Sequence, residues 1–323
     1  TLELTKMPEQ EQGLYYPDGS YKSTKQIMYE NIDSPELIRE KTNGREPTFY
    51  EWIDEFIRRR DLKTEVEGIP DEIELSFNTN KDIIWGLVGD IHSGGYEVDY
   101  ELLAHDIAFI SSHDNSFLVG GGDWTDSFFF NPAQNEMIAS FNQQRKFVNS
   151  MIKELGEDKI VALLGGDHEL WSAKMGTTIY DEFRDKYDIP IIHGTTRIRV
   201  NLPEVQYKIV GGHQLLGSSM YNDTHPENRE SKFGIQQADI YIGWHNHKKA
   251  ISYQVADGFD GDRKQLFIAS GAYKYSDEYA RKKGWAKQRS LKHGAVWLVL
   301  SPLRKEAQAF YTAEEAEKFV RGS

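Results

Sequence analysis

The sequence predicts an α/β protein whose core is a β-sandwich of two sheets flanked by helices. Two observations predict this architecture. From residue 83 onward, short apolar runs alternate with amphipathic helical stretches, as they do in βαβ units. The helical stretches fall mostly in the first half of this region and strands dominate the second half, which favours two sheets over one doubly wound sheet.

The individual elements follow from the spacing of apolar residues. Short apolar runs bounded by glycine or polar residues are expected to be strands, and longer stretches with the helical period are expected to be helices. The expected strands are 83–88, 116–119, 159–164, 206–210, 239–242, 265–269, 295–300 and 307–311. The expected helices of this region are 100–112, 133–155 and 177–186.

The first eighty residues differ from the rest, because they are polar and highly charged. Helix-like stretches occur near 34–41 and 49–60. We interpret residues 1–80 as a partly helical extension, residues 81–312 as the main domain and residues 313–323 as a C-terminal helix or tail.

Composition limits the classes of function. The chain is 39% hydrophobic and 28% charged, as in soluble globular proteins. Its apolar runs are far shorter than the roughly 20 residues that cross a bilayer, and no signal-peptide pattern opens it, so we expect a cytoplasmic protein without a membrane partner. Cysteine is absent, which excludes thiolate metal sites. The net charge of −13 argues against a protein that coats nucleic acid, although a local basic patch could still engage it.

Five apolar runs end in a glycine-bearing turn that carries Asp or His. Side chains at the carboxyl ends of neighbouring strands converge, and glycine lets the backbone turn sharply beside a ligand. Asp-x-His and His-x-His place two side chains on one face of an extended segment, where they can bind one metal ion or bridge two. The turns are Gly89-Asp90-Ile91-His92, Gly122-Asp123-Trp124-Thr125-Asp126, Gly166-Asp167-His168-Glu169, Gly212-His213 and Gly243-Trp244-His245-Asn246-His247.

In the order of these turns, the chain resembles the calcineurin-like metallophosphoesterase superfamily. The family pattern runs Asp-x-His, Gly-Asp-x-x-Asp, Gly-Asn-His-Asp/Glu, Gly-His and Gly-His-x-His, and the resemblance covers roughly residues 83–311. It implies the calcineurin-like fold and a two-metal site. By position, the implied ligands are Asp90, His92 and His247 for the first ion, Asp123 as a bridge, and Asp167, His213 and His245 for the second ion. His168 would act as general acid or stabilise the transition state.

Two residues depart from the family pattern. Asp167 stands where the family has Asn, and its added negative charge should favour metal retention over anion attraction. Trp244 separates Gly243 from His245, and we expect it in the wall of the pocket. Asp126 is interpreted as a turn residue or as a hydrogen-bond acceptor behind the ligands.

The implied chemistry is hydrolysis of phosphodiesters. Two divalent ions about 3.5 to 4 Å apart lower the pKa of a shared water, so that hydroxide can attack phosphorus in line. Imidazole and carboxylate ligands suit Mn, Fe or Zn, and Mn is our first expectation. A small-molecule phosphomonoesterase and a non-catalytic accessory subunit of the same fold are the alternatives.

A basic run between Arg281 and Lys292 suggests contacts with the substrate. Arg281, Lys282 and Lys283 lie close in sequence to Trp285, and basic groups with stacking aromatics suit DNA or RNA that is single-stranded or frayed. A solvated loop that offsets an acidic surface is an equal alternative. Lys248, directly after His247, is a further candidate contact for phosphate.

Two further features bear on the substrate and on assembly. Protein serine/threonine phosphatases carry Arg-Gly after the second motif, whereas this chain has Ser127-Phe128, which argues against that branch. The charged N-terminal block is similar to that of bacteriophage-encoded phosphoesterases, which favours a nuclease related to those of double-strand-break repair, acting in the host cytoplasm. The aromatic triplet 128–130 is either core or a subunit contact, which leaves a homodimer open.

Overall fold

The computed structural model describes residues 2–4, 45, 48–67, 72–127, 136–172, 178–187, 189–235, 237–256, 262–276, 281 and 293–322. The chain divides into two compact units, one formed by residues 6–70 and the other by residues 1–5 and 71–323. The larger unit therefore begins before the expected boundary at residue 81. The reason is the strand β2 (Glu72–Phe77), which pairs with β7 (Thr196–Asn201) as part of the sandwich.

The smaller unit contains α3 (Phe49–Glu67), which includes the helix expected at 49–60. A capping box sets its start: the Thr48 backbone N–H donates to the Glu51 carboxylate at 2.7 Å, and the Glu51 N–H donates to the Thr48 hydroxyl at 3.4 Å. The helix expected near 34–41 lies outside the described residues.

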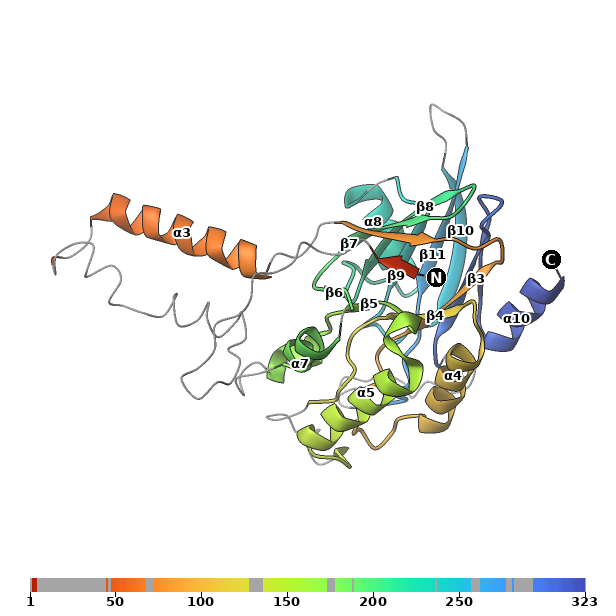
Figure 1. Cartoon of the computed structure of the whole chain (residues 1–323), viewed down its shortest axis with the longest axis horizontal. Helices are drawn as coiled ribbons and strands as arrows, with labels where there is room; N and C mark the ends of the chain where they lie inside the picture. Colours follow the sequence, from red (N-terminus) through yellow and green to blue (C-terminus); the bar gives the residue numbers. More distant parts are fainter. Residues whose placement is uncertain are drawn as a thin grey trace. The chain divides into compact units, whose positions relative to one another are not determined.

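The larger unit contains two mixed sheets flanked by helices, which confirms the predicted architecture (Figure 1). The seven-stranded sheet has the order β1 (Leu2–Leu4), β2, β7, β8 (Gln206–Gly212), β9 (Ile240–Gly243), β11 (Arg263–Ala269) and β10 (Ala250–Ala256). The six-stranded sheet has the order β13 (Ala307–Phe310), β12 (Val296–Leu300), β3 (Ile83–Val88), β4 (Ser116–Gly120), β5 (Ile160–Leu164) and β6 (Ile191–Ile192).

All eight expected strands are present with small shifts at their ends, and β1, β2, β6, β7 and β10 were not expected. Two of the missed strands, β2 and β7, show why. Alternate residues of each are buried, and the residues between them are largely charged or polar and face outward. Such strands carry too few apolar residues to stand out as apolar runs, although their period of two is that of a half-buried strand.

Two layers of core account for the continuous apolar runs of the central strands. In β3, Ile83, Trp85 and Leu87 belong to the cluster between the two sheets, whereas Ile84 and Val88 belong to the cluster under the helices. Both faces of this strand are buried, so it reads as an unbroken apolar run rather than an alternating one.

Helices cover the outer faces of both sheets. Side chains of α4 (Tyr100–Ser112), α5 (Phe141–Leu155), α7 (Ile179–Lys186) and α10 (Ala313–Gly322) pack in the cluster on the six-stranded sheet. On the other sheet, α8 (His225–Phe233) contacts β9 and β11. The expected tail 313–323 is thus largely a packed helix of the sandwich unit.

The helix expected at 133–155 begins later than its apolar spacing indicated. Its described part starts at Phe141, because Ser140 and Gln143 form a capping box, and it ends at Leu155, directly before Gly156, whose φ is 83°. In α4, the Asp99 carboxylate accepts a hydrogen bond from the Leu102 N–H at 2.9 Å. Local side-chain capping therefore sets these boundaries more sharply than periodicity does.

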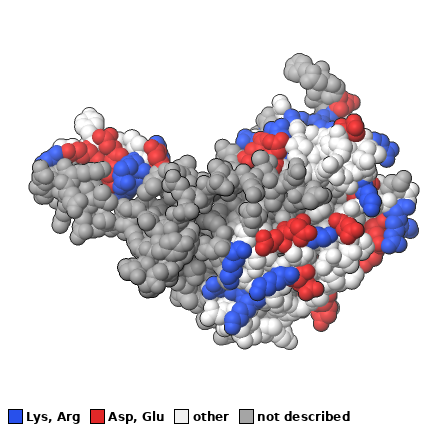
Figure 2. Space-filling model, viewed as in Figure 1, with Lys and Arg blue, Asp and Glu red and all other residues white. Residues whose placement is uncertain are grey.

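The surface of the molecule mixes charges of both signs. Figure 2 shows basic and acidic side chains in neighbouring groups across the described part of one face. Among the helices that the structure describes, none has the length and apolarity needed to span a membrane.

The core between the sheets makes a first prediction. Leu298 of β12 is fully buried there, so Leu298→Ala should lower the free energy of unfolding by about 2–5 kcal/mol, through lost burial and a residual cavity. Leu303 is 55% exposed, and Leu303→Ala should stay within about 0.5 kcal/mol of the wild type. Urea unfolding followed by circular dichroism measures both, and equal losses would contradict this assignment of the core.

Candidate metal centre

The five glycine-bearing turns converge, as the sequence predicted. Three of them follow the parallel neighbours β3, β4 and β5, and the other two follow the parallel neighbours β8 and β9 of the second sheet. Backbone hydrogen bonds join the turns: the Asp90 N–H donates to Gly122 O at 2.9 Å, His92 N–H to Asp123 O at 2.9 Å, and Trp244 N–H to the carbonyl of His213 at 3.1 Å. The site therefore lies where the ends of both sheets meet.

Seven of the predicted side chains fall into three overlapping groups. In each group, one nitrogen or oxygen atom from every member lies within 4.8 Å of the others. The groups are Asp90 with His92 and His247, His92 with Asp123 and His168, and Asp123 with His213 and His245. His92 is shared by the first and second groups and Asp123 by the second and third, so the three groups form one continuous cluster.

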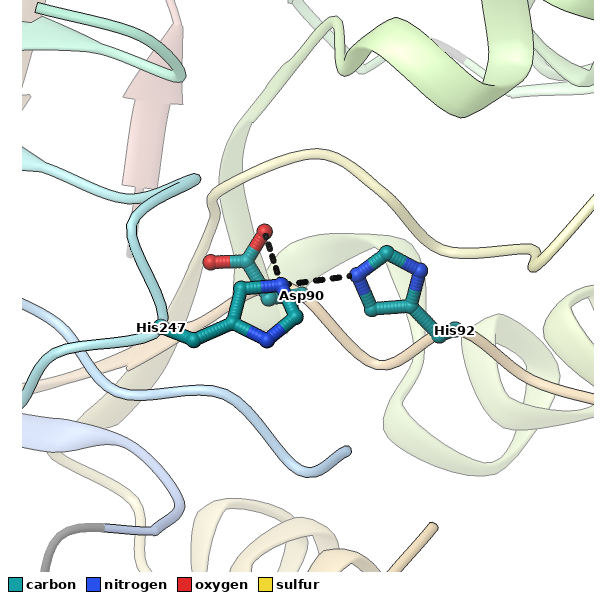
Figure 3. A group of neighbouring side chains, drawn as sticks. All are labelled: Asp90, His92 and His247. Atoms are coloured by element: carbon teal, nitrogen blue, oxygen red, sulfur yellow. Dashed lines mark hydrogen bonds and ion pairs between the residues drawn. The ribbon is translucent and has the colours of Figure 1, made fainter. Parts of the chain in front are cut away.

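In the first group, two imidazoles and a carboxylate face one another (Figure 3). The Nε2 atoms of His92 and His247 are 3.1 Å apart, and the latter is 3.9 Å from Asp90 Oδ1. The other carboxylate oxygen of Asp90 accepts the His245 N–H at 2.9 Å. That bond holds Asp90 in place and leaves Oδ1 directed toward the rings.

The Asp123 carboxylate occupies the centre of the cluster. Its Oδ1 accepts the His168 backbone N–H at 2.9 Å. Its Oδ2 lies 3.3 Å from Nε2 of His213, 3.8 Å from Nε2 of His92 and 4.0 Å from Nε2 of His168. One oxygen atom thus has three imidazole nitrogens around it.

Hydrogen bonds to carbonyl groups fix the orientation of two rings. His213 Nδ1 donates to Gly121 O at 2.6 Å, and His168 Nδ1 donates to the backbone oxygen of Asp126. Because a carbonyl can only accept, the proton is assigned to Nδ1 in both rings. In the neutral ring, Nε2 then presents its lone pair toward Asp123.

Burial and close charges set the protonation states. Burial raises the pKa of Asp90 to about 8, against the opposing effect of His213. Burial also favours neutral His213, but the Asp123 carboxylate outweighs it and raises the pKa of that ring to about 10. Burial disfavours the Asp123 carboxylate, yet His168 and His213 hold its pKa well below the usual range. Each charge in the cluster therefore depends on an opposite charge beside it.

The backbone at the site is strained, and here the expected geometry was wrong. The sequence suggested that Asp-x-His and His-x-His lie on extended segments. Instead, φ is 47° at Asp90, 51° at His92, 51° at Asp123, 68° at His245 and 53° at His247. Left-handed conformations are uncommon for residues other than glycine and concentrate at functional sites. Successive tight turns, and not strand alternation, direct these side chains to one point.

Trp244 does not lie in the pocket wall, contrary to expectation. It is 2% exposed, belongs to the core between the sheets, and its Nε1 donates to Leu87 O at 3.4 Å. A Cβ atom added to Gly121 would lie 2.2 Å from Trp244 Nε1, and one added to Gly89 would lie 2.6 Å from its Cδ1. The indole ring thus packs against the backbone at Gly89 and Gly121. It leaves no room for a side chain at either position, which explains why both residues are glycine.

The remaining predicted ligand and the predicted acceptor lie at the edge of the cluster. Asp167 begins the short helix α6 (Asp167–Ser172), and its half-exposed carboxylate is 3.5 Å from His245 Nδ1. Asp126 is buried, and its Oδ1 lies 3.3 Å from His92 Nδ1. The expected place of Asp126 behind a ligand agrees with this contact.

Two of the basic residues that were expected to contact substrate, Lys248 and Arg281, are described by the structure, and both form ion pairs with acidic residues. Lys248 Nζ is 2.8 Å from the carboxylate of Asp223, and Arg281 pairs with Glu97 and Glu136. The run from 281 to 292 contains no acidic residue, and the acidic partners of Arg281 come from distant segments, as in the alternative of a loop that offsets an acidic surface. Lys282, Lys283 and Trp285, like the triplet 128–130, lie outside the described residues.

Residues that sequence reasoning missed support the turns. The buried Glu169 carboxylate accepts the N–H of Asp123 at 3.0 Å, the N–H of Thr125 at 2.9 Å and the hydroxyl of Tyr180 at 2.9 Å. Lys274 Nζ is 2.6 Å from Asp126 Oδ1. Glu169 could have been found from its place in the third motif, whereas nothing next to Lys274 in sequence signals its partner.

The chain is similar to solved structures of two other proteins. No family model and no curated protein matches the sequence. The chain is similar to Vps29 from Entamoeba histolytica in complex with Zn²⁺, with a TM-score of 0.32 and 10% identity over 71% of this chain and 97% of that one. It is also similar to a metallophosphoesterase from Sphaerobacter thermophilus, with a TM-score of 0.35 and 10% identity over 74% and 94% of the two chains. Similarity at this level assigns neither a family nor an activity.

The contact between Trp244 and the strand ends makes the next prediction. Gly121→Ala should destabilise the protein by about 1–3 kcal/mol, because the added methyl group meets the buried indole ring. In Gly211→Ala, the nearest atom to the added Cβ is Ile198 Cδ1 at 3.8 Å, so this control should stay within about 1 kcal/mol of the wild type. Urea midpoints of the two variants check this, and an unaffected Gly121→Ala would show that the indole ring is not packed as described.

Proposed function

We propose that this protein is a calcineurin-like phosphoesterase that depends on two divalent metal ions, with Mn²⁺ as the first expectation. The observation that carries the proposal is the position of Asp123, whose Oδ2 has imidazole nitrogens from both sides of the cluster within 4.0 Å. A carboxylate in this position suits a bridge between two ions. The order of the five motifs along the chain supports the same function.

The donor atoms fit a pair of ions. Asp90 Oδ1 and His213 Nε2 are buried and form no hydrogen bond within the described part of the chain, although both face the cluster. Buried polar atoms without hydrogen bonds are rare in native proteins, and a metal ion is one established reason for them. Carboxylate oxygens with imidazole nitrogens suit Mn, Fe or Zn.

The ligand roles proposed here follow the groups. Asp90, His92 and His247 would hold one ion, His213, His245 and Asp167 would hold the other, and Asp123 would contact both. Asp167 lies at the edge of the cluster with a half-exposed carboxylate. It is assigned to the second ion mainly because of its position in the third motif.

Bound divalent ions would supply an activated water and neutralise charge on the phosphoryl oxygens. The chain itself contributes His168 as the general acid. Its Nδ1–H is engaged by the Asp126 carbonyl, which directs Nε2 toward the cluster, and the ring is 12% exposed, so it can exchange protons with solvent. Protonated Nε2 could donate to the leaving oxygen.

We propose a nucleic acid or nucleotide diester as the substrate. The sequence run from Arg281 to Lys292 supports this choice through its basic and aromatic residues. Arg281 is engaged with Glu97 and Glu136, so the proposed contacts rest on Lys282, Lys283 and Trp285. A phosphomonoesterase and a non-catalytic subunit are the alternatives that the assays below distinguish.

The central prediction concerns metal-dependent turnover. The protein should hydrolyse bis-p-nitrophenyl phosphate with added Mn²⁺, and chelation should abolish the reaction. Asp123→Asn should remove most activity because it weakens the proposed bridge, and His168→Ala should lower kcat by about 100-fold or more, as expected for loss of a general acid.

Matched controls separate these effects from damage to the fold. Asp262 is an exposed carboxylate at the start of β11, and His105 is an exposed histidine on α4, so Asp262→Asn and His105→Ala should retain full turnover. Turnover that resists chelation, or that persists undiminished in Asp123→Asn, would refute a metal-dependent enzyme. No turnover at all would favour the non-catalytic alternative.

A second prediction concerns the substrate class. With Mn²⁺, linear single-stranded DNA should be degraded faster than duplex DNA, and bis-p-nitrophenyl phosphate should be preferred over the monoester. The double variant Lys282→Ala and Lys283→Ala should raise KM for DNA but not for the small diester, because only DNA reaches both the ions and a distant phosphate contact. Lys153→Ala, at an exposed site on α5, is the control. Preference for the monoester would eliminate the nuclease and leave the phosphoesterase intact.

A further inference from the structure

We propose that Lys274 is a positioning residue of the metal centre, which holds Asp126 so that this carboxylate orients the His92 ring. The inference rests on the function proposed above, because it assigns His92 to a metal ion. It names a role for a lysine that no motif contains.

The contacts form a short chain from a lysine to a ligand. Lys274 and Asp126 are 3% and 1% exposed, and Lys274 Nζ lies 2.6 Å from Asp126 Oδ1. The same oxygen is 3.3 Å from His92 Nδ1. His92 Nε2 faces the cluster, 3.1 Å from His247 Nε2. A carboxylate this close to one ring nitrogen favours the tautomer with the proton on that nitrogen, which leaves the other nitrogen to bind a metal.

The backbone places both residues firmly in the site. The Asp126 N–H donates to Gln144 Oε1 at 3.1 Å, while its carbonyl accepts from His168. Lys274 pairs with Val98 in a β-bridge, and the preceding residue, Tyr273, donates its N–H to the carbonyl of Asp90 at 3.1 Å. The ion pair therefore joins two segments that are each hydrogen-bonded to a proposed site residue, the Asp126 segment to His168 and the Lys274 segment to Asp90.

Lys274 places a positive charge beside several buried carboxylates. Asp90, Asp123, Asp126 and Glu169 are all buried at or beside the site. Lys274 places a positive charge against the Asp126 carboxylate, and this ion pair fixes the position of the oxygen that lies beside His92 Nδ1. Lys274 is too buried to touch substrate, and its ion pair with Asp126 connects it to the His92 ring. The other buried lysine of the described chain, Lys249, donates instead to the carbonyl of His293.

The test measures Mn²⁺ binding directly, by titration calorimetry of the metal-free protein. Lys274→Met should weaken at least one Mn²⁺ site by about 10- to 100-fold, the range found when partners behind metal ligands are removed. Lys159→Met is the matched control, because this partly buried lysine donates to backbone carbonyls such as His113 O at the opposite end of β5. It should keep the wild-type affinity. Circular dichroism verifies the fold of each variant, and Lys274→Gln replaces Lys274→Met if the latter does not fold.

A double-mutant cycle separates positioning from general damage. Asp126→Asn should weaken Mn²⁺ binding as well, and the double variant should bind no more weakly than the weaker single variant, because both changes break one link. Unchanged affinity in the Lys274 variant, or losses that multiply in the double variant, would overturn the inference alone. A wild-type protein that binds no Mn²⁺ would overturn the proposed function together with it.

Discussion

The attraction between the Asp123 carboxylate and the imidazoles around it is the interaction on which the rest of the site depends. A buried carboxylate is unfavourable unless positive charge or hydrogen-bond donors surround it. Asp123 has three imidazole nitrogens within 4.0 Å of Oδ2 and a backbone N–H on Oδ1. Backbone carbonyls orient the rings of His168 and His213, Glu169 holds the backbone of Asp123, and the ion pair between Asp126 and Lys274 lies behind the cluster. The proposed metal ions would add the positive charge that this arrangement of donors suits.

Bringing these groups together requires a backbone that most sequences would not adopt. The turns bend through left-handed conformations at five of the proposed ligands, and such strain persists only where the surroundings hold it in place. Two packed sheets provide that support, because the strands ending in the turns are buried on both faces or paired on both sides. Trp244 adds to it by filling the space left by Gly89 and Gly121. The packing that makes the sandwich rigid therefore also holds the side chains of the site in place.

The expectations that were wrong or left open share a physical cause. An interpretation along the chain sees only sequence neighbours, so it could not decide whether Arg281 contacts substrate or offsets acidic residues, and only the structure shows Glu97 and Glu136 as its partners. Trp244 was assigned to the pocket because it lies between two motif residues, yet its side chain points into the core. The half-buried strands β2 and β7 were missed because their outward residues are largely charged or polar.

The sequence by itself determined the two-sheet class, the central strands and which Asp and His residues would meet, because apolar runs that end in glycine turns record burial and topology directly. Only the tertiary structure decided how those side chains meet, through left-handed turns rather than extended segments, and which residues hold them. Lys274 and Asp126 are 148 positions apart, so no local pattern could couple them. Long-range ion pairs form where folding excludes water around two segments, and that exclusion is a property of the packed chain, not of either segment alone.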